Sequence, residues 1–175
     1  RYFETPVFAA FIELASRMGY RVWLAPFMAN GKPLHVQGFL PAFERTARRT
    51  AKGLQALAGF DIPLVGLDPA MTLVYRQEYR KIAGLECPDV LLPQEWLLKA
   101  LDGQPKLPAK SVAFRLLGHC TEKTNAAPSA AMWVKVFEQA GLQVAAEATG
   151  CCGMSGTYGH EARNLETSRT IFAQS

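Results

Sequence analysis

Three cysteines in this chain could supply soft ligands to a metal. Cys151 and Cys152 are adjacent, with a glycine on each side, and Cys120 lies one expected helix and one expected strand earlier. Three thiolates suit zinc or an iron–sulfur cluster far better than calcium or magnesium. Adjacent cysteines do not easily ligate one small tetrahedral ion, but they can bind two irons of one cluster. The residues therefore favour an iron–sulfur cluster.

The loop that carries the cysteine pair is rich in glycine. Glycine lets a backbone pass close to a bulky inorganic core, where a Cβ would clash. We expect a helix to begin near His160 and to direct its amide groups at the site, which would stabilise an anionic cluster. The glycines concerned are Gly150, Gly153, Gly156 and Gly159.

Other uses of these residues remain open. The thiols could bind zinc structurally in a docking module, or Cys120 and one of the pair could cycle through a disulfide. His119 could be a ligand, a hydrogen-bond donor to a cluster sulfide, or simply a strand-end residue. Cys87 stands alone before a proline and is interpreted as a packed thiol.

Two cations follow an Asn-Gly turn in the first half of the chain. Lys32 and His35 could bind an anion or a partner's carboxylate, or they could be ordinary turn and surface residues. Glu78 and Tyr79 could contact the same edge, although a salt bridge from Glu78 to a basic residue one helical turn away is the more ordinary use. The catalytic residues of any parent enzyme are not indicated.

The elements expected to position these residues alternate between strands and helices. Strands are expected at 20–26, within 62–68 and at 88–93 in the first half, and at 111–118 and 142–148 in the second. Helices with apolar residues at helical spacing separate them, and 119–126 is expected to be a loop. Such alternation predicts an α/β fold with parallel sheets and helices packed on the sheet faces. Both cysteine-bearing loops should then leave the carboxyl edge of one sheet.

Composition excludes several classes of protein. Of 175 residues, 49% are hydrophobic, which is typical of a globular chain. The net charge of +4 does not predict nucleic-acid binding, and one basic cluster at helical spacing is interpreted as a solvated helix face. No apolar run is long enough to predict a transmembrane segment. That cluster consists of Arg45, Arg48, Arg49 and Lys52.

The spacing of Cys120 and the Cys151-Cys152-Gly153 motif resembles the CCG cysteine-rich domain. This family includes a subunit of heterodisulfide reductase and the iron–sulfur subunits of glycolate, lactate and glycerol-3-phosphate dehydrogenases. Almost the whole chain is similar to the C-terminal part of fused FAD/iron–sulfur oxidoreductases of the bacterial D-2-hydroxyglutarate or D-lactate dehydrogenase type. The stretches that carry this similarity are 1–47, 66–79, 118–124 and 150–161.

The resemblance implies two pseudo-repeated βα lobes, with departures from the family pattern. Residues 1–105 would be a degenerate first lobe, because 29–35 replaces its Cys-Cys-Gly and Met71 replaces a later cysteine. Residues 106–175 would be the second lobe, which stops before the family's trailing Cys-x-x-Cys. The cluster ligands implied here are Cys120, Cys151 and Cys152, an incomplete set.

The implied function is electron transfer within a larger enzyme. A 4Fe–4S cluster, absent or incomplete in this fragment, would pass electrons from an FAD elsewhere in the parent 2-hydroxyacid dehydrogenase to an acceptor. Its partners would be the flavin and ferredoxin-like domains of the same polypeptide. The absence of a signal peptide favours the cytoplasm, and the family also allows a peripheral place at the inner membrane face.

Overall fold

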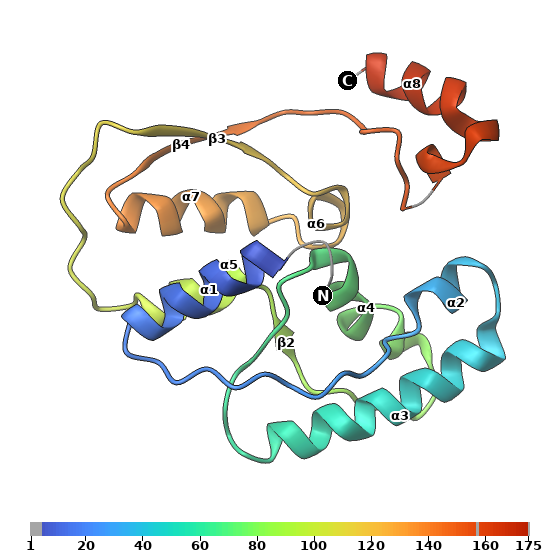
Figure 1. Cartoon of the computed structure of the whole chain (residues 1–175). Helices are drawn as coiled ribbons and strands as arrows, with labels where there is room; N and C mark the ends of the chain where they lie inside the picture. The colour runs from blue at the N-terminus through green and yellow to red at the C-terminus, as the bar shows by residue number, and fades with distance from the viewer. Residues whose placement is uncertain (1–4, 157, 175) are drawn as a thin grey trace. The chain divides into compact units, whose positions relative to one another are not determined.

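The structure is a computed structural model that describes residues 5–156 and 158–174. It divides into two compact units, Arg1–Pro93 and Gln94–Ser175 (Figure 1). The division lies before the Pro- and Lys-rich stretch at 104–110 that composition marks as a linker. The chain is a mixed α/β protein with short parallel strands, as the alternating pattern predicts. In the described residues no helix has the length and apolar character needed to cross a membrane.

The first unit is mainly helical around a very short sheet. Strands β1 and β2 pair in parallel, with Leu64 opposite Val90 and Val65 opposite Leu91. A proline near the first turn supports three of the helices, α2, α3 and α4. The elements are α1 (Thr5–Arg17), α2 (Lys32–Val36), α3 (Leu40–Ala58), β1 (Leu64–Val65), α4 (Pro69–Arg76), the 3-10 helix η1 (Tyr79–Lys81) and β2 (Val90–Leu91).

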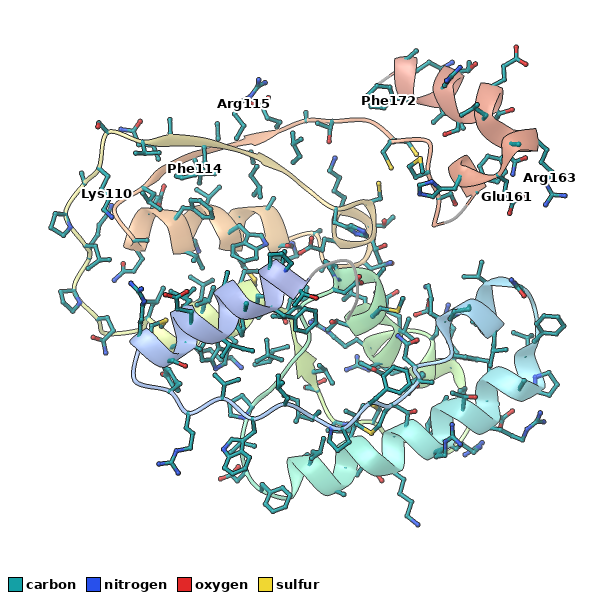
Figure 2. The ribbon with its side chains drawn as sticks, in the orientation of Figure 1. Lys110, Phe114, Arg115, Glu161, Arg163 and Phe172 are labelled. Atoms are coloured by element: carbon teal, nitrogen blue, oxygen red, sulfur yellow. The ribbon has the colours of Figure 1, made fainter. Side chains whose placement is uncertain are left out.

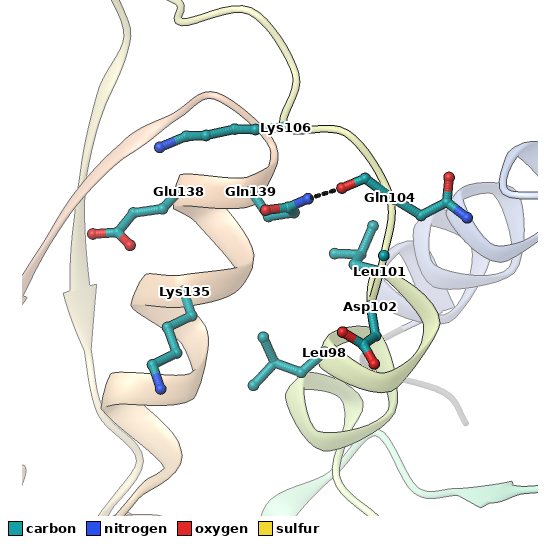
Figure 3. Close-up of a pocket in the computed structure, with 9 residues that line it drawn as sticks. Leu98, Leu101, Asp102, Gln104, Lys106, Lys135, Glu138 and Gln139 are labelled. Atoms are coloured by element: carbon teal, nitrogen blue, oxygen red, sulfur yellow. Dashed lines mark hydrogen bonds between the residues drawn. The ribbon is translucent and has the colours of Figure 1, made fainter.

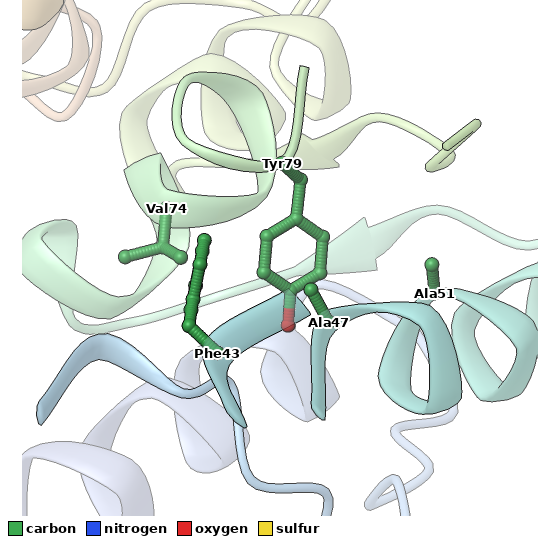
Figure 4. Packing of buried hydrophobic residues seen from close by; sticks show 5 residues of the cluster. All are labelled: Phe43, Ala47, Ala51, Val74 and Tyr79. Atoms are coloured by element: carbon green, nitrogen blue, oxygen red, sulfur yellow. The ribbon is translucent and has the colours of Figure 1, made fainter. Parts of the chain in front are cut away.

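The core of the first unit lies between α3 and the segment that contains α4 and η1 (Figure 4). Ala47 and Ala51 have small side chains, so the ring of Tyr79 packs closely against this face of α3 and has no exposed surface. Phe43 packs edge-on against that ring, with the centroids 5.8 Å apart. The Tyr79 hydroxyl donates a 2.9 Å hydrogen bond to the carbonyl of Asn30, which fixes the 30–32 loop to this core.

The second unit carries the cysteine motifs on a β–α–β framework. Strand β3 (Ala113–Leu117) pairs in parallel with β4 (Gln143–Glu147), from Ala113 opposite Gln143 to Leu117 opposite Glu147. The other elements are α5 (Pro93–Ala100), α6 (Cys120–Asn125), α7 (Ser129–Gln139), the 3-10 helices η2 (Tyr158–His160) and η3 (Ala162–Asn164), and α8 (Leu165–Ala173).

Helix α7 covers one face of the β3–β4 sheet. Phe114 of β3 packs edge-on against Phe137 of α7, with the ring centroids 5.5 Å apart. Arg115 points to the opposite face, away from α7 (Figure 2), and its Nε donates to the Glu147 carboxylate at 2.8 Å. This hydrogen bond and the positive charge hold the pKa of Glu147 below its ordinary value. The alternation therefore separates an apolar face from a charged one.

Three sequence-based expectations about local structure are wrong. Residues 20–26 form no strand. Their alternating pattern suits a half-buried strand, but a strand also needs a neighbouring strand to pair with, and this segment has none in the described residues. Residues 120–125 form helix α6 and not a loop, since His119 caps its first turn. The helix expected near His160 begins at Leu165, after two separate 3-10 turns.

The hydrogen bond from Tyr79 should contribute measurably to stability. In Tyr79→Phe the buried Asn30 carbonyl loses its donor, so we expect the free energy of unfolding to fall by about 1–3 kcal/mol. Urea denaturation measures this change. Tyr158→Phe is the control, because the Tyr158 side chain is exposed and its loss should cost less than about 0.5 kcal/mol. Equal stabilities of the two variants would contradict the role assigned to Tyr79.

Cys87 should be the least reactive thiol of metal-free protein. Burial raises the pKa of its thiol from 9.0 to about 11, and the nearby Asp89 carboxylate adds to the rise. At pH 8 little thiolate is therefore present to attack iodoacetamide, and labelling should accelerate as pH rises toward 11. Peptide mass spectrometry of the intact, folded protein measures labelling at each cysteine. Labelling of Cys87 at pH 8 as fast as that of the exposed Cys120 would contradict this expectation.

Candidate functional site

The two cysteine-bearing segments leave the same end of the β3–β4 sheet. Because the strands are parallel and Leu117 pairs with Glu147, the residues that follow both strands start from one edge. Cys120 comes three residues after Leu117, and Cys151 four residues after Glu147. Both cysteine-bearing segments, helix α6 and the loop after β4, therefore follow the carboxyl ends of the paired strands.

Cys120 is the first residue of α6. His119 precedes it as the helix cap, and its Nδ1 accepts a hydrogen bond from the Thr121 amide at 3.2 Å. The structure gives His119 this capping contact, a role that was not considered from the sequence. The Cys120 side chain is exposed.

Cys151 and Cys152 are exposed in the loop after β4, and neither forms a disulfide. Gly153 follows them in a left-handed conformation with φ of 74°. Its amide lies 3.4 Å from the Cys151 sulfur and donates a hydrogen bond to it. This hydrogen bond fixes the Cys151 side chain relative to the Gly153 turn.

The glycines of this loop have a structural explanation that sequence reasoning did not give. A Cβ on Gly153 would collide with the carbonyl oxygen of Ser168 in α8, and one on Gly159 would lie 2.6 Å from the Ser168 hydroxyl. Both positions are thus reserved for the close approach of α8. Gly156 adopts a φ of 68° with nothing near its Cβ position, while Gly150 and His160 are exposed.

The donor set has the right chemistry for a thiolate-bound group, but it is not assembled into a ligand shell. Across residues 5–156 and 158–174, no group of three or more His, Cys, Asp or Glu side chains is arranged to hold a metal. The assignment of Cys120, Cys151 and Cys152 to one metal group therefore stays a prediction. Three exposed thiols in segments that follow one sheet edge have the ligand chemistry of a thiolate-bound group.

A buried polar cluster anchors α6, the helix that begins at Cys120. Glu122 of α6 is only 8% exposed, and one carboxylate oxygen accepts hydrogen bonds from Gln94 at 2.9 Å and from Ser129 at 2.6 Å. Gln94 is fully buried, and its own Oε1 has no hydrogen-bond partner within the described residues. The cluster joins the starts of α5 and α7 to α6. The sequence patterns did not predict this cluster, because Glu122 lies 28 residues and Ser129 35 residues from Gln94 along the chain.

The cations singled out in the first unit are engaged internally. Lys32 forms a 2.5 Å ion pair with Glu78, and both side chains are largely buried. Glu78 thus makes a salt bridge, but its partner is not one helical turn away. The His35 ring packs against Phe43, with centroids 4.9 Å apart. This pairing leaves Lys32 neutralised by its own unit.

Asn30 occupies the turn that precedes Lys32. Its Nδ2 contacts the Met71 carbonyl at 3.3 Å and the Met71 sulfur at 3.0 Å, while its Oδ1 accepts from the Lys32 amide. The side chain of Asn30 thus contacts Met71 of α4 directly and holds the turn before α2 against that helix.

The second unit also contains a shallow hollow of about 400 Å³ between α5 and α7 (Figure 3). Leu98 and Leu101 line one side, and Lys135 and Glu138 line the other. Gln139 crosses its upper end and donates to the Gln104 carbonyl at 2.6 Å. The lining mixes both signs of charge and includes no thiol.

Known proteins similar to this chain are bacterial dehydrogenases. A D-2-hydroxyglutarate dehydrogenase of Pseudomonas putida is 66% identical over the whole chain, and that of Escherichia coli is 42% identical over 98% of it. One subunit of an anaerobic glycerol-3-phosphate dehydrogenase from Escherichia coli is 24% identical over 82% of the chain. No family model matches the sequence, and no solved structure matches it.

The matched region is a small part of each relative. The chain spans 17% of the length of both D-2-hydroxyglutarate dehydrogenases and 38% of the glycerol-3-phosphate dehydrogenase subunit. Every one of these relatives is a dehydrogenase or a dehydrogenase subunit. The chain is therefore homologous to one segment of larger oxidoreductases.

Proposed function

We propose that this chain is the electron-transfer module of a larger flavin-linked 2-hydroxyacid dehydrogenase. Cys120, Cys151 and Cys152 would hold an iron–sulfur cluster together with a ligand from outside this chain. When bound, the cluster supplies one-electron relay chemistry between a flavin and an acceptor. The similarity to D-2-hydroxyglutarate dehydrogenases supports this class of substrate for the parent enzyme.

One observation carries the proposal: the parallel register of β3 and β4 starts both cysteine-bearing segments, α6 and the loop after β4, from one sheet edge. The protein's own contribution there is to present exposed thiols at that edge and to hold the loop around the cysteine pair. The Gly153 amide donates to Cys151, and the exposed positions of all three thiols leave room for an added group. Packing of Gly153 and Gly159 against α8 fixes the backbone around the pair.

The first unit has a different role in this proposal. Its corresponding turn is occupied by the Asn30–Met71 contact and the Lys32–Glu78 ion pair. These contacts support a lobe that binds no cluster and serves as a folded support within the parent enzyme. The two-lobe organisation itself, with a degenerate first copy, is part of the proposal.

The cysteine ligands should be needed for metal content. We expect anaerobically purified full-length Cys151→Ser protein to contain about four fewer irons per chain than the wild type, with a matching loss of acid-labile sulfide. Cys87→Ser is the control, because Cys87 is half-buried and packs against the core of the first unit. Iron and sulfide analysis of the same preparations measures the difference.

The other possible outcomes separate the rival functions. Stoichiometric zinc in the wild type, with dehydrogenase activity retained in Cys151→Ser, would contradict electron transfer and favour a structural zinc site. A thiol count that changes with oxidant while the metal content stays constant would favour disulfide cycling.

Electron flow should fail downstream of the flavin. In Cys120→Ser, the hydroxy acid should still reduce the flavin, because that reaction occurs in another part of the enzyme. Turnover with an artificial acceptor should fall by at least about tenfold, since the relay is broken. Stopped-flow absorbance of the flavin and steady-state turnover measure the two steps separately. Unchanged turnover would exclude a relay through this chain.

A further inference from the structure

Lys123 joins the two cysteine-bearing segments. It lies three residues after Cys120, and its ammonium group donates hydrogen bonds to the Thr149 carbonyl at 2.8 Å and to the Thr149 hydroxyl at 2.6 Å. Thr149 lies two residues before Cys151. One side chain therefore spans from the helix that starts at Cys120 to the loop that carries the cysteine pair.

The strand end is shaped to let Lys123 make this reach. A Cβ on Gly118 would lie 3.1 Å from Cε and 3.4 Å from Cγ of Lys123, so the aliphatic stem runs directly over this glycine. The stem thus covers backbone while the charged end reaches the oxygens of Thr149. Any larger residue at position 118 would displace the stem.

Helix α6 is anchored on its other side by the buried cluster of Gln94, Glu122 and Ser129. A helix of six residues has little stability of its own, so these side-chain contacts hold it in place. Glu122 faces inward and Lys123, the next residue, reaches outward to the loop. The anchored helix therefore provides a fixed point from which Lys123 can restrain the loop after β4.

We propose that Lys123 is a positioning residue that holds the Cys151–Cys152 loop beside Cys120. This inference rests on the proposed function, because a group shared by thiols of both loops requires the loops to stay in register. Two hydrogen bonds from one ammonium to a carbonyl and a hydroxyl also place a positive charge at the edge where an anionic group would bind. Lys123 acts through the loop and contacts none of the reacting atoms.

Thiol cross-linking tests the proposal without a metal. Metal-free full-length protein in a Cys87→Ser background is treated with dibromobimane, and the bridge between Cys120 and either Cys151 or Cys152 is quantified by peptide mass spectrometry. We expect Lys123→Met, which keeps the stem and loses the charge, to slow bridging by at least about fivefold. Lys123→Arg should restore most of the rate, since it keeps the donors. The control is Lys135→Met, which removes a lysine that lies in α7, and it should leave the bridging rate unchanged.

A milder variant keeps the test decisive if Lys123→Met folds poorly by circular dichroism. Thr149→Val removes only the hydroxyl acceptor, so bridging should fall to a value between those of wild type and Lys123→Met. Bridging at the wild-type rate in both variants would overturn the proposal.

Iron retention separates failure of this inference from failure of the proposed function. In anaerobic protein the rate of iron loss to a chelator should rise by at least about fivefold in Lys123→Met and stay near wild type in Lys123→Arg. Wild-type protein that binds iron, with Lys123→Met identical to it in bridging and retention, overturns the positioning role alone. If wild-type protein contains no iron but Lys123→Met still slows bridging, the proposed cluster is wrong. The positioning role of Lys123 then stands.

Discussion

The parallel pairing of β3 with β4 is the constraint on which the candidate site depends. A parallel pair needs a crossover, and α7 supplies it while covering one face of the sheet through Phe137. A slip of one residue would turn Phe114 away from Phe137 and Arg115 away from Glu147, so side chains on both faces oppose it. The fixed register places the ends of both strands side by side. His119 and Lys123 follow the end of β3, and Gly153 follows the end of β4.

Sequence patterns predicted this framework well because they report local periodicity. Apolar alternation followed by helical spacing predicts β3, α7 and β4 and places both cysteine segments at one edge. The same alternation wrongly predicts a strand at 20–26, where Trp23 and Leu24 remain exposed and the segment pairs with no strand of the described residues. Periodicity states which face a strand would bury, but it carries no information on whether a neighbouring strand is present.

Contacts between distant residues were beyond such patterns. The partner of Lys32 lies 46 residues away, and the buried partner of Gln94 lies 28 residues away. The glycines after the cysteine pair were assigned to an inorganic core, whereas two of them make room for Ser168 of α8. Gly31 has the same left-handed geometry as Gly153 and packs close to Phe43 of α3. The residue before Gly31, Asn30, makes internal hydrogen bonds, whereas Cys152 before Gly153 is exposed.

The place of Gln94 has an evolutionary consequence. Its side chain is completely buried and supplies an amide donor to Glu122, although it precedes the stretch at 104–110 that composition marks as a linker. A gene fusion that joined a foreign segment within 104–110 would inherit a buried carboxylate without this donor. A recombination event that keeps this unit folded must therefore join the sequences before α5. The segment that folds with the cysteine motifs thus begins earlier than the proline-rich stretch at 104–110.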